Sequence, residues 1–219
     1  KALYQTFMEL PQSKADAILL PLVKLSIQSI KEGNMDKLHP FWWVNKYYNG
    51  ILPAGNIDKG IFSIFIMNIM FVEKYQAVFQ GAGILHAYLE GQNIELMANS
   101  DNVLRGGLTT KHIDVPELLK HVLFEPTIPQ LVNIEKLNPN EMNYPCPIED
   151  FSLSKIDITA GETYTIHTNS LEILLLMEGE VHVETLGKMK PSNTLLVLPN
   201  NAITINASQK AVIFRAFVP

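Results

Sequence analysis

The stretch Phe79–Lys111, FQGAGILHAYLEGQNIELMANSDNVLRGGLTTK, concentrates polar side chains among glycines and short apolar runs. Residues 85–89 and 93–98 flank the tight turn Glu90-Gly91, a pattern that predicts two short β-strands folding back on each other. A polar loop follows the second strand and leads to a glycine pair. Turns of this kind can bring side chains from several segments together at one site.

The predicted strands place several polar side chains of this stretch so that they could line one site. Strand side chains alternate, so His86 and Tyr88 share one face of the first predicted strand, and Glu95 lies on the second. On residue type alone, a single histidine in a strand is usually structural, a glutamate on a strand is usually solvated, and an aromatic is more often in the core. The candidates are His86, Tyr88, Glu95, Asp101, Arg105 and Lys111.

The segments AGILHAYLEG and IELMANSDNVLRGGLTTKHIDVPELL resemble the type I mannose-6-phosphate isomerases, the zinc-dependent phosphomannose isomerases of the cupin fold. The similarity is nearly unbroken from Gly83 to Phe124, and weaker similarity extends in both directions. The resemblance implies a mainly β protein with an α-helical segment, built from cupin-like β-barrel or jelly-roll modules. It also implies that the chain corresponds to the C-terminal half or more of such an enzyme, and the start at Lys1 fits an internal point of a longer protein.

The resemblance assigns a role to each candidate. His86 matches a zinc ligand of the family, and imidazole suits Zn²⁺. Arg105 and Glu95 match active-site positions and are the predicted catalytic residues. Substrate binding is predicted for Asp101, Lys111 and Tyr88.

The resemblance also implies zinc ligands that this sequence lacks. The family's other ligands are a glutamine and a histidine in a Gln-x-His motif, and a glutamate, all N-terminal to the region matched here. The sequence contains no Gln-x-His spacing. As given, it can contribute one family zinc ligand, and a lone imidazole binds zinc weakly.

The composition of the chain argues against some classes of binding partner. A net charge of −5 without a basic cluster argues against nucleic acid or anionic membrane as a partner, so a phosphate ligand would need a local basic pocket. The single cysteine, Cys146, rules out an internal disulfide and fits a cytoplasmic location. The longest apolar run, 61–72, is too short and too interrupted to span a membrane.

The chain is predicted to contain four regions: a helical domain at 1–50, part of the catalytic cupin domain at 51–124, a linker at 125–150 and a C-terminal cupin-like β domain at 151–219. In the first, Ser13 and Asp16 suggest a capping box, and Pro21 predicts either a kink or two short helices, ending at Gly33. Pro40 predicts the start of another helix that ends at Asn49-Gly50.

Hydrophobic patterns predict the remaining elements. Residues 61–72 and 76–79 are predicted strands, and Asp114 is predicted to cap a short helix. His167 and His182 lack the HxH spacing of metal-bearing cupins and are predicted to be structural. The C-terminal strands are predicted at Ser152–Ile158, Thr163–His167, Glu172–Met177, Glu180–Thr185, Thr194–Leu198, Ala202–Asn206 and Ala211–Phe217.

Two functions fit these observations. One is a zinc-dependent isomerase that interconverts mannose 6-phosphate and fructose 6-phosphate through an enediol, with this chain as a partial enzyme. The other is a non-catalytic cupin-like protein that binds a sugar phosphate or a partner. Another cupin enzyme, such as an epimerase or dioxygenase, fits the HAYLEG and NSDNVLR motifs less well. Presence of the missing ligands upstream in the full gene product would discriminate the first two.

Overall fold

The computed structural model describes residues 1–33, 35–100 and 102–219. It divides into two compact units: a helical unit of residues 1–73, 80–92 and 101–130, and a β unit of residues 74–79, 93–100 and 131–219. None of the described helices is long and apolar enough to cross a membrane.

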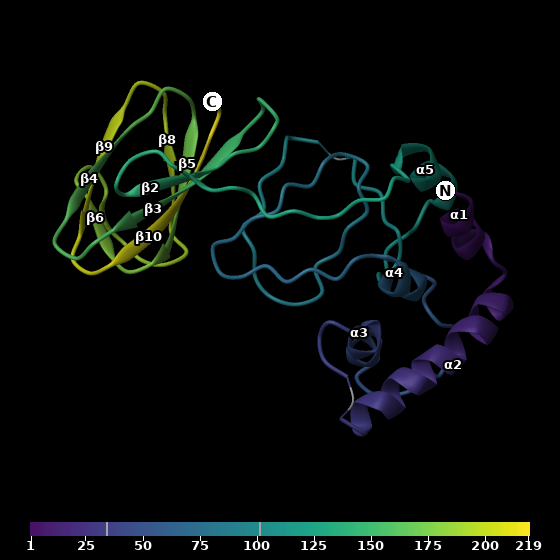
Figure 1. Ribbon diagram of the computed structural model, residues 1–219. Helices are drawn as coiled ribbons and strands as arrows, with labels where there is room; N and C mark the ends of the chain where they lie inside the picture. Colours follow the sequence, from purple (N-terminus) through teal and green to yellow (C-terminus); the bar gives the residue numbers. More distant parts are fainter. Residues whose placement is uncertain (34, 101) are drawn as a thin grey trace. The chain divides into compact units, whose positions relative to one another are not determined.

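The helical unit contains one long helix, α2, and several shorter ones (Figure 1). Helix α2 packs against α3, and α1 packs against α5. The buried residues of its larger core cluster include Leu19, Trp43 and Ile61. The helices are α1 (Ala2–Glu9), α2 (Gln12–Lys31), α3 (Pro40–Tyr47), α4 (Ile61–Ile66) and α5 (Val115–His121).

Helix α2 differs from the prediction at its start, and it decides between the two alternatives given for Pro21. It is a single helix that contains Pro21, so the alternative of two short helices is wrong. The predicted capping box is also wrong, because the N-cap residue is Pro11. Asp16 instead uses its Oδ1 to accept the backbone N–H of Ile57 at 2.9 Å, which ties the helix to a distant loop. The predicted end is confirmed, with Gly33 at φ +75° just beyond the last turn.

Local end signals placed α3 and α5 correctly. Pro40 opens α3, and the positive φ angles of Asn49 (51°) and Gly50 (69°) follow its end. Asp114 caps α5 by accepting the backbone N–H of Glu117 at 2.9 Å. These contacts join neighbours in the sequence, so residue order alone reveals them.

The predicted strand at 61–72 is wrong, because its first half forms helix α4. Apolar residues on every side of a short run fit a buried strand and a buried helix equally well. Here Ile61, Phe62 and Ile64 are buried in the helical unit. The side chain of Asp58 accepts the backbone N–H of Gly60 at 2.6 Å and so tightens the turn that starts the helix.

The hairpin predicted at 85–89 and 93–98 also fails to form. Apart from a single β-bridge between Val78 and Leu131, the described residues between α4 and α5 contain no strand, which also corrects the prediction at 76–79. An isolated two-stranded hairpin is marginal in water and needs further strands or a packing surface. Neither segment is paired as a strand with another among the described residues.

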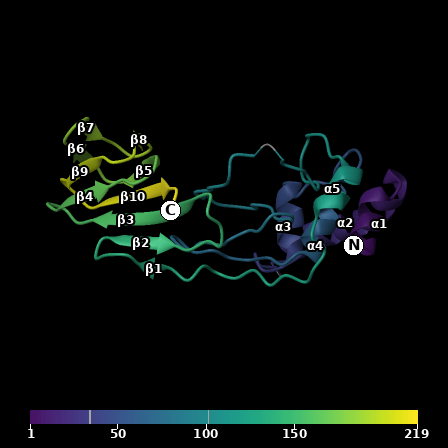
Figure 2. The same cartoon turned by 90° about the horizontal axis from the view of Figure 1, so that it is seen from above.

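The β unit is a sandwich of two antiparallel sheets (Figure 2). The six-stranded sheet has the order β1-β2-β3-β10-β5-β8, and the four-stranded sheet has the order β4-β9-β6-β7. Their core cluster combines residues of both sheets, such as Ile156 and Leu176 from one and Ile166 and Ile205 from the other. This is the cupin-like β architecture that the resemblance implied.

The strand positions in this unit follow the predicted ones closely. Three strands, β3, β4 and β10, have the predicted bounds, and β5, β6, β8 and β9 differ from theirs by one or two residues at an end. Strands β1, β2 and β7 have no predicted counterpart. Strands β1 and β2 lie inside 125–150, which therefore contributes to the sheet. The bounds are β1 (Glu135–Lys136), β2 (Glu141–Tyr144), β3 (Ser152–Ile158), β4 (Thr163–His167), β5 (Glu172–Glu178), β6 (Val181–Val183), β7 (Gly187–Met189), β8 (Thr194–Val197), β9 (Ala202–Ala207) and β10 (Ala211–Phe217).

A charged cluster lies buried within the β unit. Arg215 donates from Nε and Nη2 to both carboxylate oxygens of Glu172, at 2.6 and 2.7 Å, and from Nη1 to Glu141 Oε1 at 3.1 Å. Ser154 and Tyr164 donate their hydroxyl protons to Glu141 at 2.5 and 2.8 Å. Strands β2, β3, β4, β5 and β10 thus meet in one network. The two glutamates are 3% and 1% exposed, so each needs these partners.

We expect Arg215→Met to lower the free energy of unfolding of the β unit by about 3–5 kcal/mol, because it leaves two buried carboxylates without their cation. Urea unfolding followed by far-ultraviolet circular dichroism would measure the change. Lys188→Met is the matched control, since Lys188 pairs with Glu180 at an exposed site and its loss should leave the midpoint unchanged. Equal midpoints for Arg215→Met and wild type would contradict the role given to the network.

Two tyrosines of the β unit predict a loss of stability at alkaline pH. Burial raises the pKa of Tyr144 to about 12, and burial together with the hydrogen bond to Glu141 raises the pKa of Tyr164 to about 12. The folded state therefore favours the neutral phenols. Their contribution to stability is complete below the unfolded pKa of 10.0 and is lost as the pH rises toward 12.

Urea midpoints measured across this alkaline range should fall with pH. Tyr144→Phe, which cannot ionise, should show a shallower fall than the wild type over the same interval. Parallel pH profiles for the two proteins would rule out the ionisation of Tyr144 as a cause.

Candidate active site

His86 lies on an exposed segment that is fixed at its base. The backbone N–H of Leu123, just after α5, donates to the carbonyl oxygen of Gly83 at 2.9 Å. Gly83 has φ +78°, and a Cβ there would lie 2.7 Å from the carbonyl oxygen of His121. Only glycine fits this approach, so Gly83 holds the start of the His86 segment against the end of α5.

The imidazole of His86 is arranged in a way that suits metal binding. Its Nδ1 lies 2.9 Å from the carbonyl oxygen of Ile84. A carbonyl can only accept, so in the neutral ring Nδ1 carries the proton and Nε2 keeps its lone pair. Metal-bound histidines commonly use such a backbone carbonyl to fix the tautomer. The ring centroid of Tyr88 is 5.9 Å away, so these two candidates lie together.

The far end of the segment is held by ion pairs that sequence reasoning missed. Glu90 pairs with Lys37 at 2.5 Å and with Lys46 of α3 at 3.0 Å. Hydrogen bonds from Lys37 and then Lys46 lower the pKa of the Glu90 carboxyl. Both ammonium groups also lie over the ring of Trp42, at 5.1 and 5.2 Å from its centroid. These partners lie about 50 residues from Glu90, so no local pattern could reveal them.

Arg105 is half-buried in the helical unit, directly before a close backbone contact. A Cβ on Gly107 would lie 2.4 Å from the Cα of Gly60, and one on Gly106 would lie 2.8 Å from the hydroxyl of Tyr4. That hydroxyl donates to the carbonyl oxygen of Gly106 at 3.3 Å. The glycine pair therefore packs where no side chain fits, and this contact positions Arg105.

The remaining candidates fall in both units and outside the described residues. Lys111 is exposed in the helical unit, where its backbone N–H donates to the hydroxyl of Thr109 at 3.1 Å. Glu95 lies in the β unit and is exposed, while its neighbour Ile94 packs on the smaller core cluster of that unit. Asp101 is outside the residues that the structure describes. The structure thus brings His86 and Tyr88 together, and the roles of all these candidates stay predictions.

Zinc fits His86 as one ligand, but the described residues supply no complete ligand set. No group of three or more histidines, cysteines, aspartates or glutamates among them could hold a metal ion. The free Nε2 of His86 has the right donor chemistry for one coordination position.

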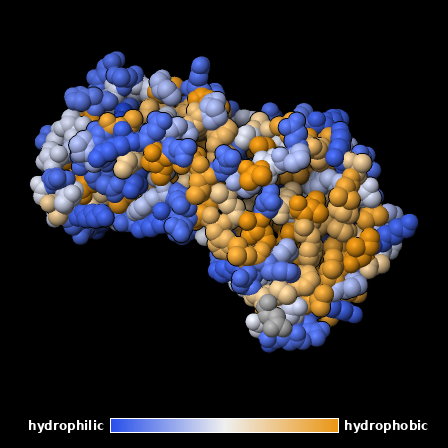
Figure 3. All heavy atoms as spheres, in the orientation of Figure 1, coloured by the Kyte–Doolittle hydropathy of each residue, from blue (hydrophilic) through white to orange (hydrophobic). Residues whose placement is uncertain are grey.

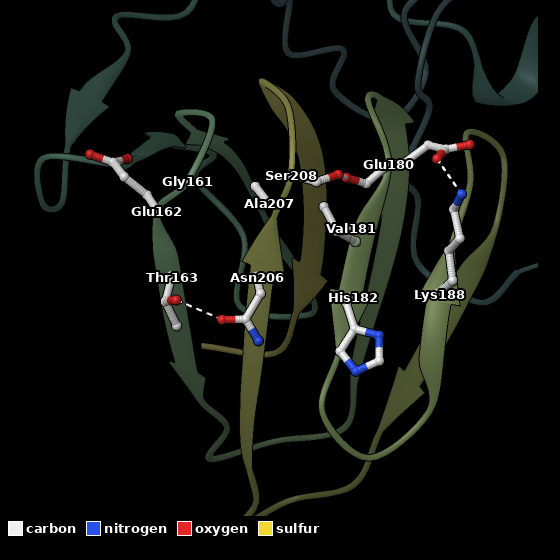
Figure 4. A pocket seen from close by; sticks show the side chains of 10 residues that line it. All are labelled: Gly161, Glu162, Thr163, Glu180, Val181, His182, Lys188, Asn206, Ala207 and Ser208. Carbon is white, nitrogen blue, oxygen red and sulfur yellow. Dashed lines mark hydrogen bonds and ion pairs between the residues drawn. The ribbon is translucent and has the colours of Figure 1, made fainter.

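A polar hollow lies elsewhere, on the four-stranded sheet of the β unit (Figure 4). Its volume is about 480 Å³, and a row of paired residues crosses it from strand to strand. Thr163 donates to Asn206 at 2.6 Å, and Lys188 pairs with Glu180 at 2.5 Å. Along the row stand Thr163, Asn206, His182 and Lys188. Among the described residues, none of the predicted site residues lines this hollow.

Comparison with known proteins identifies relatives of the chain. It is 38% identical over 156 residues to mannose-6-phosphate isomerase of Salmonella typhimurium, covering 71% of this chain and 38% of that protein. It is 30% identical over 172 residues to the human mannose-6-phosphate isomerase, covering 73% and 41%. The chain thus spans about two fifths of the length of these relatives. No protein-family model matches it.

Solved structures of phosphomannose isomerases are similar to this chain as well. A lysine-to-alanine mutant of phosphomannose isomerase from Salmonella typhimurium superposes with a TM-score of 0.74 at 27% identity, covering 99% of this chain and 55% of that one. Another structure of that species' mannose 6-phosphate isomerase, bound to the substrate fructose 6-phosphate and zinc, superposes with a TM-score of 0.64 at 28% identity.

We expect Gly107→Ala to destabilise the helical unit by about 1–3 kcal/mol, because φ at Gly107 is +129° and the added methyl would meet Gly60. Both tryptophans of the chain, Trp42 and Trp43, lie in this unit, so urea unfolding can be followed by tryptophan fluorescence. Gly55→Ala is the control, because a Cβ there meets nothing within 4 Å. A Gly107→Ala protein as stable as the control would show that the contact is dispensable.

Proposed function

We propose that this chain, a relative of the mannose-6-phosphate isomerases, supplies part of the active site of an enzyme that interconverts mannose 6-phosphate and fructose 6-phosphate. The observation that carries the proposal is the 38% identity to such an enzyme over 71% of the chain. The local geometry of His86 supports it, since its tautomer leaves Nε2 free for a metal. Because the chain spans less than half of these relatives, the activity is proposed for the complete gene product.

The reaction moves a proton between C1 and C2 of the sugar phosphate through an enediol, while negative charge develops on oxygen. When bound, Zn²⁺ would act as a Lewis acid that polarises a substrate oxygen. His86 would hold it through Nε2, with further ligands from outside this chain. The cationic guanidinium of Arg105 would stabilise the developing negative charge.

The other candidates would move the proton and hold the substrate. The carboxylate of Glu95 is a candidate to accept the proton from one carbon and return it to the other. Lys111 would attract the phosphate, and Asp101 and Tyr88 would orient the sugar. The single cysteine, Cys146, and the mildly acidic composition fit an enzyme of the reducing cytoplasm.

His86→Ala in the complete gene product should lose bound zinc and reduce turnover by more than about 100-fold, since even outer-shell partners of metal ligands contribute about 10–100-fold. Zinc stoichiometry and conversion of fructose 6-phosphate to mannose 6-phosphate are the measurements. His112→Ala, at an exposed histidine of the same unit, is the matched control and should retain both. Full zinc content and turnover in His86→Ala would refute the assigned role.

A second function is favoured by one observation, the incomplete ligand set among the described residues. On this alternative the protein is a non-catalytic, cupin-like binder of a sugar phosphate or of a partner protein. A complete gene product that binds fructose 6-phosphate in calorimetry but contains no zinc and converts no substrate would establish it.

A further inference from the structure

The turn at residues 57–60 is built into the apolar interior of the helical unit. Ile57 and Ile61, on either side of it, are buried in the larger core cluster, and Figure 3 shows hydrophobic residues gathered on a face of this unit. The backbone N–H of Ile57 donates to Asp16 of helix α2 at 2.9 Å. The turn is therefore fixed relative to the core and to the longest helix, and it can support a neighbouring loop.

Asp58 connects this turn to the end of helix α3. Its Oδ1 accepts the backbone N–H of Gly60 at 2.6 Å, and its Oδ2 accepts the hydroxyl proton of Tyr47 at 3.2 Å. Its own backbone N–H donates to the hydroxyl of Tyr48 at 3.3 Å. Asp58 is half-buried, and hydrogen bonds to a carboxylate are stronger than those to a neutral acceptor. One residue thus joins two consecutive tyrosines to the backbone of Gly60.

The loop that carries Arg105 packs directly on the turn that Asp58 stabilises. The Oδ1 atom that accepts the Gly60 N–H lies 3.4 Å from the position of a Cβ built on Gly107, and the backbone of Gly60 is nearer still. Because the two backbones are in contact, a movement of Gly60 displaces Gly107. Arg105 precedes this contact by two residues, so the place of its half-buried side chain depends on the turn.

We propose that Asp58 is a positioning residue for Arg105. It fixes the turn on which the Arg105 loop packs, and so holds the guanidinium where negative charge develops during the isomerisation. The aspartate acts through the contact between Gly60 and Gly107, and not by touching the substrate. Such an effect can be large, because a misplacement of about 1 Å at a catalytic group costs about 100-fold in rate. The inference rests on the proposed function for the reaction, but the effect on Arg105 itself does not require turnover.

Kinetics of the complete gene product test the proposal. Asp58→Ala should lower kcat by about 10- to 100-fold and change KM by less than about twofold, because it weakens an interaction made only in the transition state. Asp58→Asn keeps an oxygen for the Gly60 N–H and should restore most of kcat. Asp36→Ala is the matched control, since Asp36 Oδ1 also accepts a backbone N–H two residues ahead, that of Leu38 at 2.9 Å, but at an exposed turn. Unaltered kcat in Asp58→Ala would overturn the proposal.

A double substitution separates positioning from a general structural effect. If Asp58 acts through Arg105, Asp58→Ala should lower kcat no further once Arg105→Ala has removed the guanidinium. Losses that multiply in the double variant would overturn the proposal. Tryptophan fluorescence checks that the helical unit of each variant is folded. If Asp58→Ala does not fold, Asp58→Glu replaces it, because this change keeps the charge but moves the carboxylate away from its place beside the Gly60 N–H. It should lower kcat with the same dependence on Arg105.

Chemical labelling of Arg105 gives a readout that does not depend on turnover. The sequence contains two arginines, and the other one, Arg215, is paired with two glutamates in the β unit. Phenylglyoxal reacts with guanidinium groups, so mass spectrometry of the labelled 219-residue chain follows both sites. Asp58→Ala should accelerate the labelling of Arg105 by about tenfold, since the loop loses a support that depends on a hydrogen bond to a charged group. Labelling of Arg215 should be unchanged. Equal rates for Arg105 in the variant and the wild type would overturn the proposal.

The two kinds of measurement separate this inference from the proposed function. Faster labelling of Arg105 in Asp58→Ala, with a complete gene product that converts no fructose 6-phosphate, would support the positioning role and count against the isomerase. Conversion of fructose 6-phosphate at the same kcat in Asp58→Ala and the wild type would support the isomerase and overturn the positioning role.

Discussion

The contact between Gly60 and Gly107 is the constraint on which the candidate site in the helical unit depends. A Cβ built on either residue would fall within about 2.5 Å of the other segment's backbone. Two backbones can approach this closely only where both side chains are absent. Gly60 immediately precedes α4 and Gly107 follows Arg105 by two residues, so one contact joins a buried helix to the loop of a candidate catalytic residue. The position of Arg105 is therefore set by backbone packing.

The β unit is organised by a different balance of forces. Apolar side chains of both sheets form its main core, and this burial is the dominant favourable term. The Glu141–Arg215–Glu172 network adds little net stability if it is compared with an apolar replacement, because desolvating three charges is costly. The network instead joins β2, β5 and β10, because Arg215 pairs with a glutamate on each of the other two strands.

The two units differ in how complete their strand pairing is. Strands of the β unit have partners within the same stretch of chain, and their cores are closed. Residues 80–92 of the helical unit carry the HAYLEG motif and contain no strand.

The sequence by itself determined most strands of the β unit, the start of α3 at Pro40, the cap of α5, and the similarity to the isomerases carried by HAYLEG and NSDNVLR. These features depend on alternation and on contacts between near neighbours, which residue order contains. Tertiary structure decided that 61–66 is a helix, that Glu90 pairs with Lys37 and Lys46, and that 85–89 forms no strand. The ion pairs of Glu90 join residues that are distant in the sequence. The conformations of 61–66 and 85–89 depend on what packs against them, because a short apolar run fits a helix and a strand equally well.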